Sequence, residues 1–273
     1  KAALTLLNKH YKNPNLCLLN ILYFLFTSDE RNDEYFTYYL EIRPLLDPSN
    51  VCIAYFQCLF AEVHLQKKNI LEAEKMIQQA IPVIKKNLYG TLSYWNTIYI
   101  LALLMTLKKK FHTALYHLQK ILDNLDLNYN VEREFFVQVS CRMIDIYSTQ
   151  KNFTQCIIHL ESLRQFFDTH EGLLAEFGEK IYINILVRLA DAYLTRNEYD
   201  KAIGIYNTAK IFLSQHSLSL SSFYHIIILL MMAFVNIFKG DLLNAKDIFC
   251  DLQYHLFEYL NSDELTSNYQ EMI

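Results

Sequence analysis

Hydrophobic residues recur along the chain with the spacing of amphipathic helices, and short polar breaks divide this pattern at regular intervals. Five breaks share one order: a basic residue, a short polar stretch, an apolar residue and, three positions later, a small residue. They lie at residues 68–73, 109–114, 151–156, 196–202 and 239–245. Because a small residue lets two helices approach closely, each break is predicted to join the two antiparallel helices of a hairpin.

A wider frame connects these breaks. Small or medium apolar residues stand twelve positions before the small residue of each break (Ala61, Ala102, Ile144, Ala190 and Ala233) and seven positions after it (Ala80, Ile121, Leu163, Ala209 and Leu252). The frame resembles the tetratricopeptide repeat, whose small positions let paired helices pack while aromatic residues fill the gaps. A weaker copy precedes the others, with a helix at Leu16–Phe26 and a partner centred on Tyr38. About six hairpins are therefore expected.

We predict an all-α fold: a right-handed superhelix of tetratricopeptide-like hairpins (an α-solenoid), in a single domain covering residues 1–273. The small residues at 73, 114, 156, 202 and 245 are 41 to 46 positions apart. This interval exceeds the standard repeat of about 34, so the helices are expected to be long and the stack irregular. The polar stretches 44–50 and 123–130 are interpreted as loops between repeats. Residues 223–260 are too apolar for a free solenoid end, so the tail 254–273 is expected to cap it or to form a dimer contact.

Composition narrows the choice of fold and partner. The chain has 5 glycines and 4 prolines, too few for the many turns of a β fold, and its 52% hydrophobic content excludes general disorder. The net charge of -4 provides no basic field for a nucleic-acid backbone. DNA contact is therefore expected only through a domain absent from this chain.

The sequence also predicts a cytoplasmic protein without membrane contact. Its six cysteines are scattered and include no C-x-x-C pair, as in a reduced intracellular protein. The most apolar run, residues 226–238, spans 13 residues and contains Asn236. A bilayer requires about 20 residues, so this run is interpreted as a buried helix. Residues 1–7 lack the apolar core of a signal peptide.

The first helix of each hairpin should line the concave face, and its inward positions carry side-chain amides. The frame places Asn96, Gln138 and Asn184 at equivalent positions. An amide both donates and accepts hydrogen bonds, so a row of amides can pair with the backbone of an extended peptide. The alternative interpretation is that these positions are polar only because they face water. Tyr99, one turn beyond Asn96, is expected to supply part of an apolar wall.

Charged residues follow seven positions further on. Asp145 and Asp191 would attract a basic ligand, and Arg142 and Arg188 would neutralise them or hold a ligand carboxylate. Each arginine also stands three residues before an aspartate, so intrahelical ion pairs are an equal alternative. The proposed peptide-binding set comprises Asn96, Tyr99, Gln138, Arg142, Asp145, Asn184, Arg188 and Asp191.

Sequence signatures of catalysis are missing. The chain contains no H-E-x-x-H, no G-x-G-x-x-G or P-loop and no G-x-S-x-G. We therefore expect no catalytic residue, no metal and no cofactor. An enzyme of the helical hydrolase or phosphatase kind remains a third alternative, to be judged by whether Asp145 or Asp191 meets a nucleophile or a metal partner.

Long, irregular repeats with aromatic-rich helices, in an acidic chain rich in Tyr, Asn and Lys, resemble the regulatory domains of Gram-positive peptide-pheromone receptors, the Rgg, PlcR, PrgX and Rap group. The resemblance implies a homodimer that binds a short peptide in its concave groove, with Asn96, Gln138 and Asn184 gripping the peptide backbone. Most such receptors also carry a helix-turn-helix domain, which this chain lacks. The expected function is thus the peptide sensor of a quorum-sensing transcription regulator. The alternative is a repeat adaptor that docks a protein partner.

Overall fold

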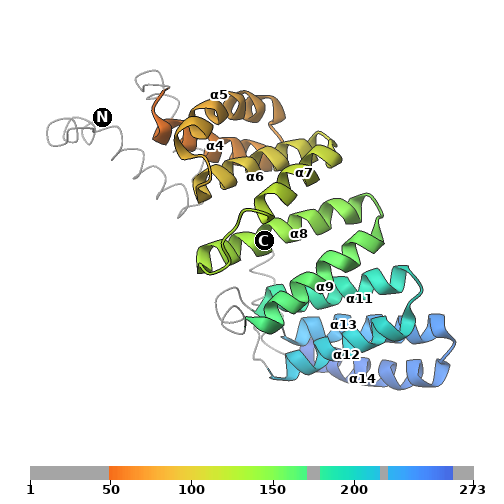
Figure 1. Cartoon of the computed structure of the whole chain (residues 1–273). Coiled ribbons are helices and arrows are strands. Elements are labelled where there is room, and N and C mark those ends of the chain that lie inside the picture. Colours follow the sequence, from red (N-terminus) through yellow and green to blue (C-terminus); the bar gives the residue numbers. More distant parts are fainter. Residues whose placement is uncertain (1–48, 171–178, 216–220, 261–273) are drawn as a thin grey trace. The chain divides into compact units, whose positions relative to one another are not determined.

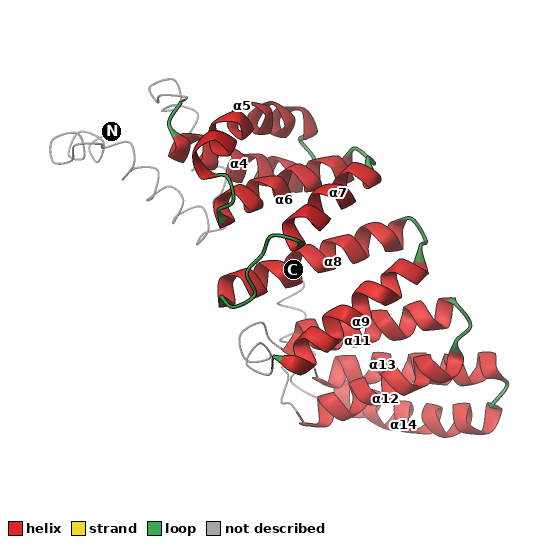
Figure 2. Cartoon of the chain, in the orientation of Figure 1, coloured by secondary structure: helices red, strands yellow, loops and turns green. Residues whose placement is uncertain are grey.

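The computed structural model describes residues 49–170, 179–215 and 221–260, and all regular secondary structure within these ranges is α-helical (Figures 1 and 2). The helices are α4 (Val51–Gln66), α5 (Ile70–Leu88), α6 (Leu92–Leu107), α7 (Phe111–Leu122), α8 (Asn130–Thr149), α9 (Phe153–Thr169), α11 (Glu179–Thr195), α12 (Tyr199–Gln215), α13 (Ser221–Lys239) and α14 (Leu242–Leu260). The all-α prediction is confirmed. The weaker first copy, at Leu16–Phe26 and around Tyr38, lies outside the described residues.

The chain divides into two compact units, residues 1–139 (unit 1) and 140–273 (unit 2), and α8 runs from one into the other. The single-domain organisation stays a prediction. The predicted loop at 123–130 is confirmed over residues 123–129, because α7 ends at Leu122 and Asn130 is already the first residue of α8. In the part of the chain that the structure describes, no helix combines the length and apolar character needed to cross a membrane.

The described part of unit 1, residues 49–139, consists of two hairpins and the first half of α8. Helix α4 packs along α5 and α6 along α7, while α6 also contacts both α4 and α5. The alanines of the sequence frame lie at these contacts without exposed surface: Ala61, Ala73, Ala80, Ala102 and Ala114. Because an alanine side chain ends at Cβ, the helix backbones approach closely, and large buried residues such as Phe60 and Met76 occupy the remaining space.

The described part of unit 2 repeats this arrangement with the second half of α8, α9 and the helices α11, α12, α13 and α14. Helix α11 contacts both α9 and α12, α12 contacts α13, and α13 packs along α14. Ala190, Ala202, Ala209 and Ala233 are fully buried where helices meet. Cys156 takes the small position on α9, where its thiol donates to the carbonyl oxygen of Ile144 on α8 at 3.7 Å. The second helix of one hairpin thus supports the first helix of the next.

The five predicted breaks form one kind of turn. Each contains a residue with positive φ: Lys68 (62°), Lys109 (58°), Lys151 (56°), Asn197 (60°) and Gly240 (84°). The next residue's N–H donates back to a carbonyl five positions earlier, as from Asn69 to His64 at 2.7 Å and from Lys110 to Met105 at 2.8 Å. This pattern is the Schellman motif, which satisfies the last carbonyls of a helix. It ends every first helix at the same point of the repeat.

Candidate functional site

A cavity of about 220 Å³ in unit 1 brings together two of the predicted amides. It lies among α4, α6 and the first half of α8, and is lined by Tyr55, Leu92, Ser93, Asn96, Val131, Glu134, Phe135 and Gln138. We call it the amide cavity. Its α8 residues recur every three or four positions, so they occupy one face of that helix. Asn96 and Gln138 thus face a common space although 42 residues of sequence position separate them.

The polar groups of the amide cavity are only partly used within the protein. The Asn96 side-chain N–H donates to the Tyr55 hydroxyl at 3.2 Å. Gln138 is exposed. Neither the Asn96 side-chain carbonyl nor the Gln138 amide makes a hydrogen bond with any residue in the described ranges. A ligand can therefore meet both a donor and an acceptor from two neighbouring helices.

Tyr99 lies in the core beside the amide cavity. Its side chain is only 3% exposed and packs edge-on against Phe135, with ring centroids 5.7 Å apart. Tyr99 follows Asn96 by three residues, which is about 60° short of one full helical turn. Its side chain is therefore directed into the core beside Asn96 and not into the cavity. Tyr99 thus supports Phe135, which lines the cavity, and its contact with a ligand stays a prediction.

Unit 2 holds a charged cluster formed by Arg142, Asp145 and Arg188. The Arg188 guanidinium on α11 donates to one Asp145 carboxylate oxygen on α8 at 2.7 Å, and Arg142 lies 3.7 Å from the other oxygen. The intrahelical pair at 142 and 145 is thus present, whereas Arg188 pairs between helices instead of with Asp191. Two guanidinium groups share one carboxylate, and the buried Nε of Arg142 has no hydrogen-bond partner. The cluster carries a net positive charge.

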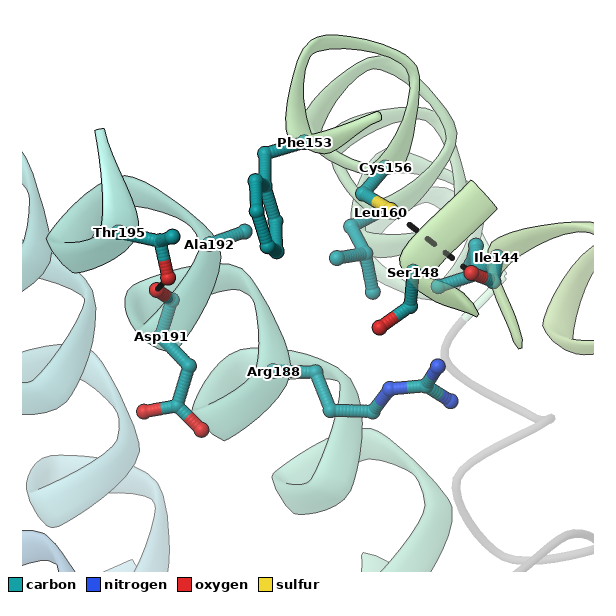
Figure 3. Close-up of a pocket in the computed structure, with 9 residues that line it drawn as sticks. All are labelled: Ile144, Ser148, Phe153, Cys156, Leu160, Arg188, Asp191, Ala192 and Thr195. Carbon is teal, nitrogen blue, oxygen red and sulfur yellow. Dashed lines mark hydrogen bonds between the residues drawn. The ribbon is translucent and has the colours of Figure 1, made fainter. Parts of the chain in front are cut away.

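Asp191 belongs to the same helix as Arg188 but is bound elsewhere. Its carboxylate accepts a short hydrogen bond from the hydroxyl of buried Tyr206 on α12. Burial raises the pKa of Asp191, and this hydrogen bond opposes the rise. Figure 3 shows the Arg188 side chain extending toward Ser148, while the Asp191 carboxylate points the other way. The two charges therefore diverge toward separate partners.

A cavity of about 140 Å³ opens between these charges, among α8, α9 and α11. It is lined by Ile144, Ser148, Phe153, Cys156, Leu160, Arg188, Asp191, Ala192 and Thr195 (Figure 3). At about 30 Å³ for each water, a space of this size takes a single small group rather than a whole peptide. Asn184 is exposed one turn before Arg188, so helix geometry puts it on the face of α11 that carries Arg188 and Asp191.

Burial and hydrogen bonds determine the state of the thiols and carboxylates in the described ranges. Burial raises the pKa of Cys58 to about 12 and also raises the pKa values of Cys141 and Cys156, so these thiols stay protonated and are weak nucleophiles. Asp145 and Asp191 meet arginine and tyrosine side chains, not a nucleophile. Across the described ranges, no three His, Cys, Asp or Glu side chains are grouped so as to hold a metal ion.

Sequence reasoning missed several residues of both sites. Ser93 and Glu134 line the amide cavity one turn before Asn96 and Gln138, so extending the inward stripe backwards along each helix would have found them. The hydrogen bond from Tyr206 to Asp191 joins α12 to α11, and the two residues are 15 positions apart in the sequence. No local pattern marks that bond, because it depends on how deeply α11 and α12 pack.

No family model and no curated protein sequence matches the chain. Among solved structures, the "putative kinesin light chain nearly identical TPR-like repeats" of Podosopora anserina is similar at a TM-score of 0.59, with 14% identity over 79% of this chain and 99% of that one. BtubC from P. vanneervenii gives a TM-score of 0.59 at 12% identity, covering 78% of this chain and 83% of that one. The chain has a tetratricopeptide-like repeat fold. The expected family resemblance is thereby confirmed at the level of fold.

The similar structures include a quorum sensor with this tetratricopeptide-like fold. The apo form of NprR from B. thuringiensis matches at a TM-score of 0.53 with 16% identity, over 87% of this chain and 64% of that one. These neighbours are repeat and regulatory proteins. At such identities the similarity describes how the helices are arranged.

Proposed function

We propose that this chain binds a short peptide through the first helices of its hairpins and acts as the sensor of a cytoplasmic, peptide-responsive transcription regulator. The observation that carries the proposal is the amide cavity, where Asn96 and Gln138 from two successive first helices face one concave space. A scaffold repeat has no need of inward amides at equivalent positions. An extended peptide does, because each of its backbone units presents one donor and one acceptor.

The size and walls of the amide cavity fit one segment of an extended ligand. Leu92, Val131 and Phe135 provide an apolar wall beside the amides. A volume of about 220 Å³ is below the range of a drug-sized pocket, about 300 to 1,000 Å³, but accommodates one or two side chains. Apolar side chains would settle against this wall while Asn96 and Gln138 hold the adjoining peptide bonds.

The charged cluster supplies a second kind of contact within unit 2. Arg142, Asp145 and Arg188 have side chains between 31% and 45% exposed, so a ligand can reach them without unfolding the helices. With two arginines for one aspartate, a ligand carboxylate would gain charge-assisted hydrogen bonds there. Asn184 stands one turn away on the same face of α11 and would hold the neighbouring peptide bond.

Signalling requires that the peptide favour one conformation over another, because a ligand shifts an equilibrium only by its difference in affinity for the two states. DNA contact in such a regulator would come from a separate domain, since the net charge of -4 gives this chain no electrostatic attraction to DNA. In this role the chain acts as a binding protein and not as an enzyme.

A selection experiment tests the proposal. Random heptapeptides with free termini are selected on the full chain, and enriched peptides are titrated by calorimetry. Asn96→Ala and Gln138→Ala should each weaken binding by about 1 to 3 kcal/mol, since a buried peptide group would lose its partner. Gln78→Ala, which removes an exposed glutamine on α5 outside the cavity, should bind as the unaltered chain does.

Two results would redirect the proposal. If selection enriches no peptide, or if both cavity variants bind as tightly as the Gln78 control, the amide cavity is not a peptide site. If acetylated and amidated peptides bind as well as free ones, the ligand is an internal segment of a protein, and the chain is an adaptor. On α11 the matched pair is Asn184→Ala against Asn207→Ala, an exposed asparagine on α12.

A further inference from the structure

The turns inside the two hairpins of unit 1 gather positive charge at one edge of that unit. Residues 66–75 span the turn between α4 and α5, and residues 107–116 span the turn between α6 and α7. Together they contain six lysines and two glutamates: Lys67, Lys68, Lys75, Lys108, Lys109 and Lys110, with Glu72 and Glu74. Four positive charges are therefore unbalanced there, in a chain whose net charge is -4. We call these two turns the basic edge.

The two turns belong to one surface. The Lys108 ammonium, just after α6, lies 2.7 Å from the Glu74 carboxylate in the first part of α5, so the second turn adjoins the beginning of α5. Both turns stand on the same side of unit 1 (Figure 2). The remaining lysines that matter here are exposed, and their side chains make no hydrogen bond or ion pair with any residue in the described ranges: Lys68, Lys75, Lys109 and Lys110. Their charges are available to a partner.

The equivalent turns of unit 2 are electrically neutral. The same ten positions of the α11–α12 and α13–α14 turns hold four basic and four acidic residues. Arg196 and Lys201 both contact Glu198, at 2.9 Å and 2.7 Å. Lys239 contacts Asp200 at 2.6 Å. The repeat therefore folds with balanced turns, and the excess of lysine in unit 1 is not a requirement of the hairpin.

Apolar surface accompanies the charge of the basic edge. Leu71 is 84% exposed, the largest value for a large apolar side chain in the described ranges, and Leu107 beside Lys108 is 41% exposed. Leu71 and Lys75 are four positions apart on α5, so they occupy one face of that helix. A partner that fits this surface must present carboxylates next to apolar side chains.

We propose that the basic edge binds an acidic segment of another protein, whose carboxylates pair with the lysines while an apolar side chain packs on Leu71. At physiological salt the field of a charge is largely screened beyond about 8 Å, so a short segment senses the edge and little else. A DNA duplex or an anionic bilayer extends past the edge and meets a chain of net negative charge. The basic edge also contains no arginine, the residue whose planar fork suits phosphate groups.

This surface is separate from the amide cavity. Leu92, the first residue of α6, lines that cavity, whereas Lys108 of the basic edge follows the last residue of the same helix. A helix of 16 residues is about 24 Å long. A ligand in the cavity and a partner on the basic edge can therefore be bound independently.

Fluorescence anisotropy of the full chain tests the inference. The probe is an amidated dodecapeptide of glutamates with a leucine at every fourth position, labelled with fluorescein at its amino terminus. It should bind, and its dissociation constant should rise by about tenfold or more between about 50 mM and about 300 mM sodium chloride, because salt screens exposed charges. Asn96→Ala should bind this probe as the unaltered chain does, so failure of the proposed groove peptide would leave the measurement unaffected.

Two matched pairs of lysines locate the contact. The double variant Lys68→Glu with Lys109→Glu should raise the dissociation constant by about 30-fold or more, since two attractions become repulsions. Lys85→Glu with Lys86→Glu changes the net charge equally, at exposed positions of the last turn of α5. These two residues lie about 25 Å along the chain axis from Lys68, so screening should keep their effect below about twofold.

A neutral substitution tests the apolar part of the contact. Leu71→Gln should raise the dissociation constant of the probe by about fivefold, because a well-exposed leucine loses its apolar contact with the ligand. Ile211→Gln, at a side chain 57% exposed on α12, should leave it unchanged. Both positions are exposed, and unchanged helical circular dichroism verifies that the variants fold.

Three outcomes would overturn the inference. The probe could fail to bind at about 50 mM salt, where the attraction is strongest. The two lysine pairs could have equal effects, which would mean that the probe responds to net charge and not to the basic edge. Vesicles of phosphatidylcholine and phosphatidylglycerol, or a DNA duplex, could bind more tightly than the probe and lose that affinity in Lys68→Glu with Lys109→Glu. The edge would then serve a membrane or a nucleic acid.

Discussion

The amide cavity of unit 1 and the charged cluster of unit 2 occupy corresponding parts of the repeat, yet their chemistry differs. In unit 1, Asn96 and Gln138 are neutral, and most of their hydrogen-bonding atoms are unused by the described residues. In unit 2, the Arg188 guanidinium already donates to Asp145, and the Asp191 carboxyl group already accepts from Tyr206. The amides of the cavity can bind a ligand directly, whereas the charged residues of unit 2 must first give up their contacts within the protein.

This difference separates two uses of a polar residue in a helical repeat. A neutral amide at a half-buried position costs little to leave unpaired, because water still reaches it. A half-buried carboxylate requires a partner, and Tyr206 and Arg188 supply one by joining adjacent helices. The charged cluster and Asp191 of unit 2 therefore join adjacent helices through ionic or charge-assisted contacts, whereas the amides of the cavity in unit 1 have one neutral hydrogen bond, from Asn96 to Tyr55.

The largest effect on the free energy of unfolding is expected from a pair of matched variants, Tyr206→Phe in unit 2 and Tyr55→Phe in unit 1. Tyr206→Phe removes the donor to half-buried Asp191 and should lower the free energy of unfolding by about 2 to 3 kcal/mol at pH 7, since the carboxylate loses its hydrogen bond in a desolvated place. Tyr55→Phe removes a hydroxyl that accepts from solvent-accessible Asn96 and should cost less than about 1 kcal/mol. Urea unfolding followed by circular dichroism measures both.

The Asp191→Asn variant completes the tyrosine comparison. Asparagine keeps an acceptor for Tyr206 but removes the charge, so it should be less harmful than Tyr206→Phe. Equal losses in Tyr206→Phe and Tyr55→Phe would mean that the two regions do not differ in the way their polar groups are satisfied.

The second largest effect is expected from acid, which should lower the stability of unit 2 more than that of unit 1. Burial lowers the pKa of His225 on α13 to about 4, helped by His255 and Lys210 and opposed by Asp251. In the unfolded chain His225 binds a proton near pH 6.5, whereas in the folded chain it binds one only near pH 4. The free energy of unfolding therefore falls as the pH drops from about 6.5 to about 4. Between pH 7 and pH 5 the free energy of unfolding should fall by about 1 kcal/mol, because solvent screening at this half-buried position reduces the full effect of about 2 kcal/mol. The larger part should fall on unit 2, because burial also lowers the pKa values of His64 and His117 in unit 1, but less than that of His225.

Two probes distinguish the units in that experiment. Trp95, the single tryptophan, lies in unit 1, whereas circular dichroism reports all helices. At pH 5 the circular dichroism transition should move to lower urea than the Trp95 fluorescence transition, and His225→Asn should reduce the gap. His112→Asn, at an exposed histidine of unit 1, is the control. Coincident transitions at both pH values would show that acid does not act on unit 2 alone.

The fold was predictable because its signal is local and repeated. Each break specifies two structural features. Its basic residue and polar positions form a Schellman turn, as at Lys109, and the small residue three positions after the apolar one allows a close helix contact, as at Ala114. Five copies of the pattern reinforce one another, so an error in a single copy does not change the fold.

The candidate sites were predictable only in part, because helix periodicity gives the face of a residue and not its depth. Asn96 and Gln138 lie in the cavity at the predicted frame position, whereas Tyr99 is directed into the core by a rotation of about 60°. Ion pairs between side chains of different helices were still harder to predict from the sequence. Arg188 had Asp191 three residues away as an apparent partner, yet its reach across to Asp145 gave the shorter contact of 2.7 Å.

The smallest expected effect concerns a feature that both units share. Lys109 in unit 1 and Lys151 in unit 2 hold positive φ, which costs a residue with a Cβ about 1 kcal/mol relative to glycine. Lys109→Gly and Lys151→Gly should each therefore raise the free energy of unfolding by about 0.5 to 1 kcal/mol. Gly240→Ala provides the reverse change: an added Cβ would meet no atom within 4 Å, so any loss of stability reports backbone strain alone. Gains that differ between Lys109→Gly and Lys151→Gly would mean that the turns are not equivalent, and the contrast between the units would then extend from their side chains to the backbone of the repeat.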